Sequence, residues 1–405
     1  MNWLRLLPGV LLVACGGGGG GADGGNEGPC QGTQLVQSWP DDATAEFCTR
    51  SWTTDDPALV LTECGDVFER CSDSGPDPDF SCIDTPPGPP PETPATVTLT
   101  GWVDVFSSGP SSDNARLQLY AESALEGVTD LATATAMAEL DIQLDAGTLV
   151  DARACPKDTT FMQGQCVVPT ADCGGACDKE IAAGQFCWQG SCVDLQRWEI
   201  PYTVTDVPTN QFLVMRTIGL DGGGNPQVTG NTWSPLVQYN VYLSTADRAC
   251  ADADDRDCID TTGDPAIYRA DVNLLSSQDY MTIPTSAGLS AGITAGNGAI
   301  AGEVHDCNGI RLQHAQVGFA VGRSPRVLVY FNGNPVRTLP RLQQFPQGTD
   351  PLGLFAGLDL TPGPVSIDAI GVSSGALRET GRFTARIWPD TVTLVRLGAN
   401  RPPQQ

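Results

Sequence analysis

The clearest pattern in the chain is an alternation of apolar and polar residues that begins after position 95. It runs through residues 96–106, TVTLTGWVDVF, and resumes at residues 115–120, ARLQLY, after the turn-forming stretch SSGPSSDN. A period of two puts one face of a strand in a core and the other toward solvent. The pattern therefore predicts half-buried β-strands here, and further strands at 202–205, 211–216 and 237–243.

Helix signals are sparse by comparison. Asp56-Pro57 is typical of a helix start, with an N-cap residue followed by proline at the first helical position. Cys64 and Cys71 would share one face of that helix, and residues 276–283 predict a short helical turn. The expected fold is mainly β and multidomain, with tandem Greek-key β-sandwich domains plus small disulfide-rich modules.

Changes in composition divide the chain into segments. The proline-rich stretch TPPGPPPETP marks the clearest boundary, because it favours an extended polyproline linker. The expected order is a lipoprotein signal peptide at 1–14, a lipidated cysteine and glycine-rich tether at 15–29, a Cys-rich helical module at 30–84, the linker at 85–95, a divergent β-sandwich at 96–220 with a Cys-rich insert at 155–192, a connecting region with an acidic loop at 221–297, and a β-sandwich at 298–400.

The charge balance excludes one class of partner. The chain has 48 acidic against 22 basic residues and a net charge of −26. Such a protein repels nucleic acid and anionic lipid headgroups, so we expect neither as a partner. Divalent cations remain compatible with this charge.

Fifteen cysteines change the picture again. Setting Cys15 aside leaves an even number, and in an exported protein this predicts a disulfide framework. Zinc is not expected, because the chain has no Cys-x₂-Cys unit and only two histidines. We expect Cys250 and Cys258 to close a loop, and Cys307 to be a candidate partner for the odd cysteine of the first module. The disulfide candidates are Cys30, Cys48, Cys64, Cys71, Cys82, Cys155, Cys166, Cys173, Cys177, Cys187, Cys192, Cys250, Cys258 and Cys307.

The first fifteen residues are typical of an export signal. A short apolar stretch follows Arg5, and it is shorter than the roughly 20 residues that span a bilayer. It ends in Leu-Val-Ala-Cys15, which resembles the lipobox of bacterial lipoproteins. The resemblance implies cleavage before Cys15 and acylation of that cysteine, and Gly16 in place of Asp implies the outer membrane. Six consecutive glycines would then be a flexible tether. An ordinary signal peptide with an incidental cysteine is the alternative.

A second resemblance lies in residues 302–317, GEVHDCNGIRLQHAQV. These residues resemble the opening of a carboxypeptidase regulatory-like domain, of the transthyretin-like group, with the pattern G-x-V-x-D-x-x-G-x-x-L-x-x-A-x-V. Val304 should face a core, Gly309 should form a hairpin turn, and Pro362-Gly363 should form a turn with positive φ at glycine. The resemblance implies a small β-sandwich used for folding, spacing or adhesion, and it brings no catalytic residues.

Residues 96–220 resemble the same family more weakly. Gly101-Trp-Val103-Asp104 matches part of the opening, and Pro208-Thr209-Asn210 stands where Pro-Gly is expected. Asn tolerates a left-handed φ, so the turn could survive. We therefore expect a second, divergent copy of the sandwich.

One serine lies in a catalytic pattern. Gly288-Leu-Ser290-Ala-Gly292 matches the G-x-S-x-G nucleophile elbow, with Asp306 and His314 as conceivable partners. The motif needs a strand before it and a helix after it, and no alternating βα units are predicted. A chance match in a glycine-rich chain is the alternative.

Two groups of residues suggest metals. Asp252, Asp254, Asp255 and Asp257 form the densest carboxylate cluster, with Asp260 and Asp264 nearby, and oxygen-rich loops bind calcium. Arg256 and the lack of a following glycine depart from an EF-hand, so a solvated acidic loop closed by a disulfide is the alternative. The second group is Glu303, His305, Asp306 and His314, in which residues 303 and 305 would share one strand face and residue 306 would face away.

These observations favour a non-enzymatic, lipid-anchored cell-envelope protein at the outer membrane or cell surface. It would act as a binding, adhesion or structural module, held to the bilayer by its acyl anchor, with a protein or glycan ligand, no nucleic acid and no cofactor. The alternatives are a secreted serine hydrolase using Ser290, or a calcium-dependent adhesin using the acidic loop at 252–264.

Overall fold

The computed structural model describes the chain from residue 95 onward, with gaps. The described ranges are 95–106, 114–144, 148–151, 160–162, 165–167, 185–188, 191–194, 196–227, 232–250, 257–307, 312, 315–320, 323–331, 340, 348–349, 353–373, 376–379 and 383–398. The expected signal peptide, tether and first Cys-rich module lie outside them.

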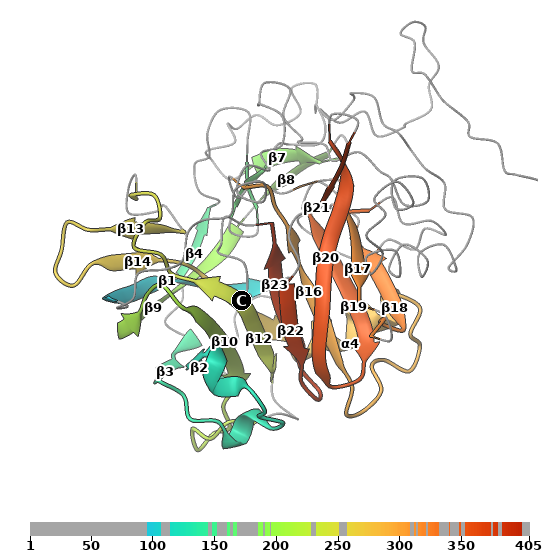
Figure 1. Ribbon diagram of the computed structural model, residues 1–405, viewed down its shortest axis with the longest axis horizontal. Coiled ribbons are helices and arrows are strands. Elements are labelled where there is room, and N and C mark those ends of the chain that lie inside the picture. The colour runs from blue at the N-terminus through green and yellow to red at the C-terminus, as the bar shows by residue number, and fades with distance from the viewer. Residues whose placement is uncertain are drawn as a thin grey trace, which may run out of the picture.

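An eight-stranded sheet forms the centre of the molecule. Its pairs are antiparallel except for β16–β23 and β23–β12, which are parallel. β12 and β23 lie side by side in the middle of Figure 1, where the two halves of the sheet meet. The strand order is β18 (Val327–Tyr330), β19 (Leu354–Leu360), β16 (Gly298–Val304), β23 (Val392–Leu397), β12 (Leu236–Tyr242), β10 (Phe212–Gly219), β2 (Ala115–Ala121) and β3 (Ala138–Ile142).

We call β12, β10, β2 and β3 the first half of this central sheet, and β23, β16, β19 and β18 the second half. A second sheet packs on one face of the first half. The side chains of Leu99 and Leu274 from the second sheet meet Leu117, Leu119 and Leu213 from the central sheet in one apolar core. The second sheet has the order β11 (Trp233–Ser234), β15 (Val272–Ser276), β1 (Thr96–Phe106), β14 (Ile267–Arg269) and β13 (Cys258–Asp260), with β9 (Gln196–Pro208) joining β1 to β4 (Thr148–Asp151).

A third sheet packs against the second half. It consists of β17 (Gln316–Phe319), β20 (Gly363–Ser373), β21 (Ala376–Glu379) and β22 (Phe383–Ile387). Val365 and Ile367 of this sheet meet Ile300 and Phe355 of the central sheet. The same core continues over the first half, where the 3₁₀ turns η1 (Glu122–Leu125) and η2 (Leu131–Thr133) contribute Leu125 and Leu131.

The opposite face of the second half is covered by helix α4 (Ser277–Ser286) and the turn that follows it. Ser276 begins the helix, because its hydroxyl accepts the Asp279 N–H at 3.0 Å. The helical turn expected at 276–283 is therefore confirmed, and it extends three residues further.

Among the described strands, three β-bulges break the ladders, and each contains an Asx residue at positive φ. Asp206, Asn240 and Asp359 have φ values of 59°, 58° and 62° at the register shifts of β9, β12 and β19. Short polar side chains tolerate this left-handed region better than other non-glycine residues. The bulges reverse the side-chain parity along each strand, so that alternation continues on the correct face.

The sequence predictions for this part of the chain are largely confirmed. All five expected strands are present, as β1, β2, β9, β10 and β12. Asn210 has a φ of 55° and Gly363 a φ of 125°, as the two turns require, and Val304 is fully buried. The mainly β, multidomain fold is also confirmed. Residues 221–297, expected as a connecting region, supply β11 to β15 and α4. β12 lies in the central sheet, the other four strands lie in the second sheet, and α4 covers the central sheet.

The Cys-rich insert contains two hairpins within its described residues. They are β5 (Thr160–Met162) with β6 (Gln165–Val167), and β7 (Gln185–Trp188) with β8 (Ser191–Asp194). Gly309 and His314 lie outside the described residues.

Candidate functional site: the disulfide-closed loop

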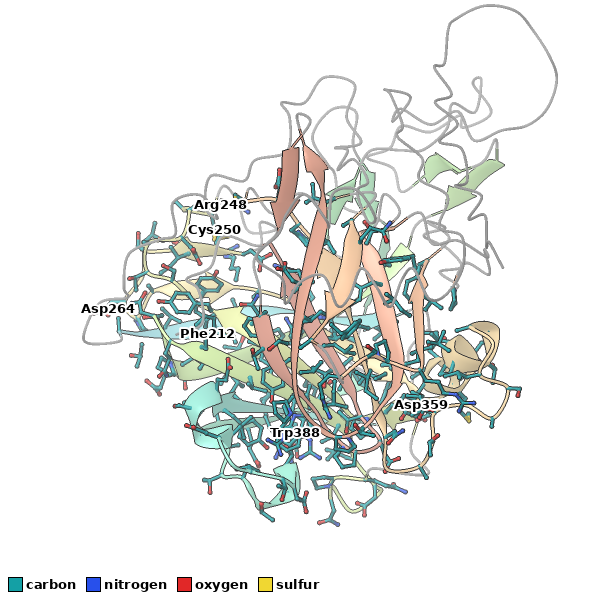
Figure 2. The ribbon with its side chains drawn as sticks, turned by 45° about the vertical axis from the view of Figure 1, so that its right-hand side comes forward. Phe212, Arg248, Cys250, Asp264, Asp359 and Trp388 are labelled. Carbon is teal, nitrogen blue, oxygen red and sulfur yellow. A yellow bond between two sulfur atoms is a disulfide. The ribbon has the colours of Figure 1, made fainter. Side chains whose placement is uncertain are left out.

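The loop between β12 and β13 is closed by the expected disulfide. Cys250 and Cys258 are bonded with their Cα atoms 5.0 Å apart. The Cys250 N–H donates to the Ile259 carbonyl at 3.2 Å, and the Ile259 N–H donates to the Arg248 carbonyl at 3.0 Å. Figure 2 labels Arg248 and Cys250 in this loop. The disulfide and these two backbone hydrogen bonds hold the acidic segment against β13.

A buried tyrosine holds the start of the same loop. The Tyr268 hydroxyl, on β14, donates to Asp247 Oδ2, which also accepts the Ser244 N–H at 3.2 Å. Tyr242 lies nearby, and its pKa is raised by burial and further by the negative charge of Asp247. Asp247 is therefore a structural acceptor for the loop.

The end of the loop is tied to the central sheet through one arginine. Arg396 Nη1, on β23, donates to Asp257 Oδ2 at 2.8 Å. Arg396 also stands opposite Glu303 in the parallel β16–β23 register, and Glu303 Oε2 lies 2.8 Å from Nε2 of the fully buried His305. We call Asp257, Glu303, His305 and Arg396 the arginine clasp.

Electrostatics explains why the clasp holds a charged arginine at the sheet. Burial by itself lowers the pKa of Arg396, but the negative charges of Asp257 and Glu303 outweigh burial and raise its pKa above the usual value. The Arg396 backbone carbonyl accepts the Asn240 Nδ2–H at 2.6 Å, so the clasp is also joined to the β12 bulge. The clasp thus links the loop to β16 and β23, and Asn240 links it to β12.

The neighbouring acidic residues are likewise engaged. Asp260 Oδ1 accepts the hydroxyl and the N–H of Thr262 at 2.6 and 3.0 Å, and Arg269 Nη2 donates to Asp260 Oδ2 at 3.1 Å. The Thr262 hydroxyl, followed by the other donors, lowers the pKa of Asp260. Asp264 lies in the exposed turn between β13 and β14 (Figure 2).

These contacts bear on the two metal interpretations. Asp252, Asp254 and Asp255 lie outside the described residues, and Asp257 is paired with Arg396. Across the part of the chain that the structure describes, no three His, Cys, Asp or Glu residues are grouped so that they could hold a metal ion. Glu303 and His305 do share one face of their strand, as expected, but their side chains contact each other within the clasp.

Ser290 does not have the geometry of a nucleophile elbow. It lies exposed in a turn that follows helix α4, whereas the elbow requires a strand before the serine and a helix after it. The helix ends at Ser286, and Gly288 continues the chain with a φ of 92°, so the turn is a helix terminus. The proposed partner Asp306 is buried, and His314 lies outside the described residues.

The glycine-rich stretch after Ser290 is instead held by two carboxylates. Asp359 accepts the Thr294 N–H at 2.9 Å, the Thr294 hydroxyl at 3.0 Å and the Asn297 Nδ2–H at 2.8 Å, and Arg326 lies 3.3 Å from it. Asp390 accepts the Gly296 N–H at 2.9 Å. Burial by itself raises the pKa of Asp359, but these donors outweigh burial and lower its pKa.

Sequence reasoning missed Arg396 and Asn240. Arg396 interrupts the apolar run of VTLVRL, and Asn240 interrupts VQYNVYL. A polar residue within an otherwise buried strand was the available signal, because such a residue needs a partner across the sheet.

Comparisons with known proteins leave the family open. No family model matches the chain, and no curated protein matches it. The resemblances of residues 1–15 and 298–400 therefore stay predictions. No helix within the described ranges is long and apolar enough to cross a membrane.

Several solved structures match this chain weakly. The minor pilin GBS52 of Streptococcus agalactiae is 11% identical over 76% of this chain and 98% of that chain, with a TM-score of 0.17. The shaft pilin SpaA of Lactobacillus rhamnosus GG is 11% identical over 77% and 99%, with a TM-score of 0.17. A leucine-rich repeat protein of Bacteroides thetaiotaomicron is 6% identical over 76% of this chain and 27% of its own length, with a TM-score of 0.16. With TM-scores this low, the function must be argued from the chain's own residues.

Proposed function

We propose that the chain is a non-enzymatic, lipid-anchored protein of the cell envelope that acts as a binding or structural module. Cys15 is its lipid-bearing residue, and the glycine-rich segment after it separates the folded part from the bilayer. The non-enzymatic proposal rests on how the candidate catalytic and metal-binding side chains are engaged. Asp257, Glu303 and His305 are used in the arginine clasp, and Ser290 lies in the turn after helix α4.

Disulfide chemistry supports an exported location. Cys250 is bonded to Cys258, and Cys307 is also disulfide-bonded, with a partner that is not among the cysteines whose side chains are described. Disulfides persist in oxidising compartments and are rare in the cytosol.

Lipidation is tested by intact mass and by fractionation. The wild-type chain, expressed with its own leader in a diderm bacterial host, should start at Cys15, carry the added mass of its acyl chains and sediment with membranes, since two or more chains make a stable anchor. The matched control is Cys15→Ala, which should remain in the soluble fraction or retain its leader. An unmodified Cys15 thiol, or identical fractionation of both proteins, would contradict the anchor.

The absence of hydrolase activity is tested separately. The wild-type protein and Ser290→Ala should hydrolyse a panel of short- and long-chain esters at the same background rate. An ester hydrolysis rate that the substitution removes, without a change in the thermal midpoint, would restore the hydrolase interpretation and refute a non-enzymatic function.

A further inference from the structure

We draw no further inference here: the strongest candidate, the outer face of the second sheet where the Thr100 hydroxyl on β1 lies 3.3 Å from the Thr203 hydroxyl on β9 and Trp102 lies two residues further along β1, carries nothing because nothing in the described part of the chain shows what covers this face.

Discussion

Two loops of this protein are fixed by aspartates with left-handed backbones, but in different environments. The loop at 288–298 is held by Asp359, whose side chain is 4% exposed. The loop between β12 and β13 is held by Asp257, whose side chain is 42% exposed, and by the Cys250–Cys258 disulfide. Both aspartates have positive φ, of 62° and 51°. The aspartates of the two loops therefore share a left-handed backbone conformation and differ in how far the carboxylate is exposed to water.

That difference shows what a carboxylate can contribute at each position. The Asp359 carboxylate is buried and accepts three hydrogen bonds from Thr294 and Asn297, so it acts through several hydrogen bonds at once. Asp257 makes one pair with a partly exposed arginine, and water screens that pair. The Cys250–Cys258 disulfide fixes the loop between β12 and β13, whereas hydrogen bonds to Asp359 fix the loop at 288–298.

The largest expected effect is that of Asp359→Ala. The substitution leaves the Thr294 N–H and the Asn297 amide without their acceptor inside the protein. Because the variant loses three hydrogen bonds to a buried carboxylate, the free energy of unfolding should fall by about 3 kcal/mol in a urea titration. The control is Thr361→Ala, at an exposed position outside this loop, which should change stability far less. Equal losses in the two variants would argue against the special role of Asp359.

The pH dependence sharpens the same point. The pKa of Asp359 is lowered in the folded protein. The native state therefore binds fewer protons at this site than the unfolded chain, and stability rises with pH. This contribution is complete above the unfolded value of about 3.9 and is lost as the pH falls through the folded pKa. The stability difference between wild type and Asp359→Asn should shrink on acidification below about pH 4, and a constant difference would contradict the assignment.

An intermediate effect is expected for the double substitution of Cys250 and Cys258 by serine. Opening so short a loop should lower the free energy of unfolding by about 2 kcal/mol, since short cross-links constrain the unfolded chain less than long ones. The measurement is urea unfolding of both proteins without reductant. As a check, a mild reductant should leave unchanged the difference in free energy of unfolding between wild type and Asp359→Ala.

The smallest effect is expected for Asp257→Asn. Asparagine keeps the left-handed backbone and removes only the charge opposite Arg396. The loss should be about 0.5 kcal/mol, and it should diminish further in 0.5 M salt because the pair is partly exposed. A loss as large as that of Asp359→Ala would show that the arginine clasp is screened far less than its exposure indicates.

The sequence by itself determined the local features of this protein. Alternation predicted β1, β2, β9, β10 and β12, because a strand must separate core-facing from solvent-facing residues whatever its neighbours are. Local chemistry predicted the positive φ of Asn210 and Gly363 and the start of α4 at Ser276, since each depends on a few adjacent residues. The pairing of Cys250 with Cys258 followed from their short separation.

Only the tertiary structure decided which distant residues meet. The parallel pairing of β12 with β23 joins residues about 150 positions apart, and alternation carries no information about strand partners. The same holds for the arginine clasp and for the contact of Asp359 with Thr294. Each group depends on the register of separate strands, and register is set by the packing of whole sheets against one another.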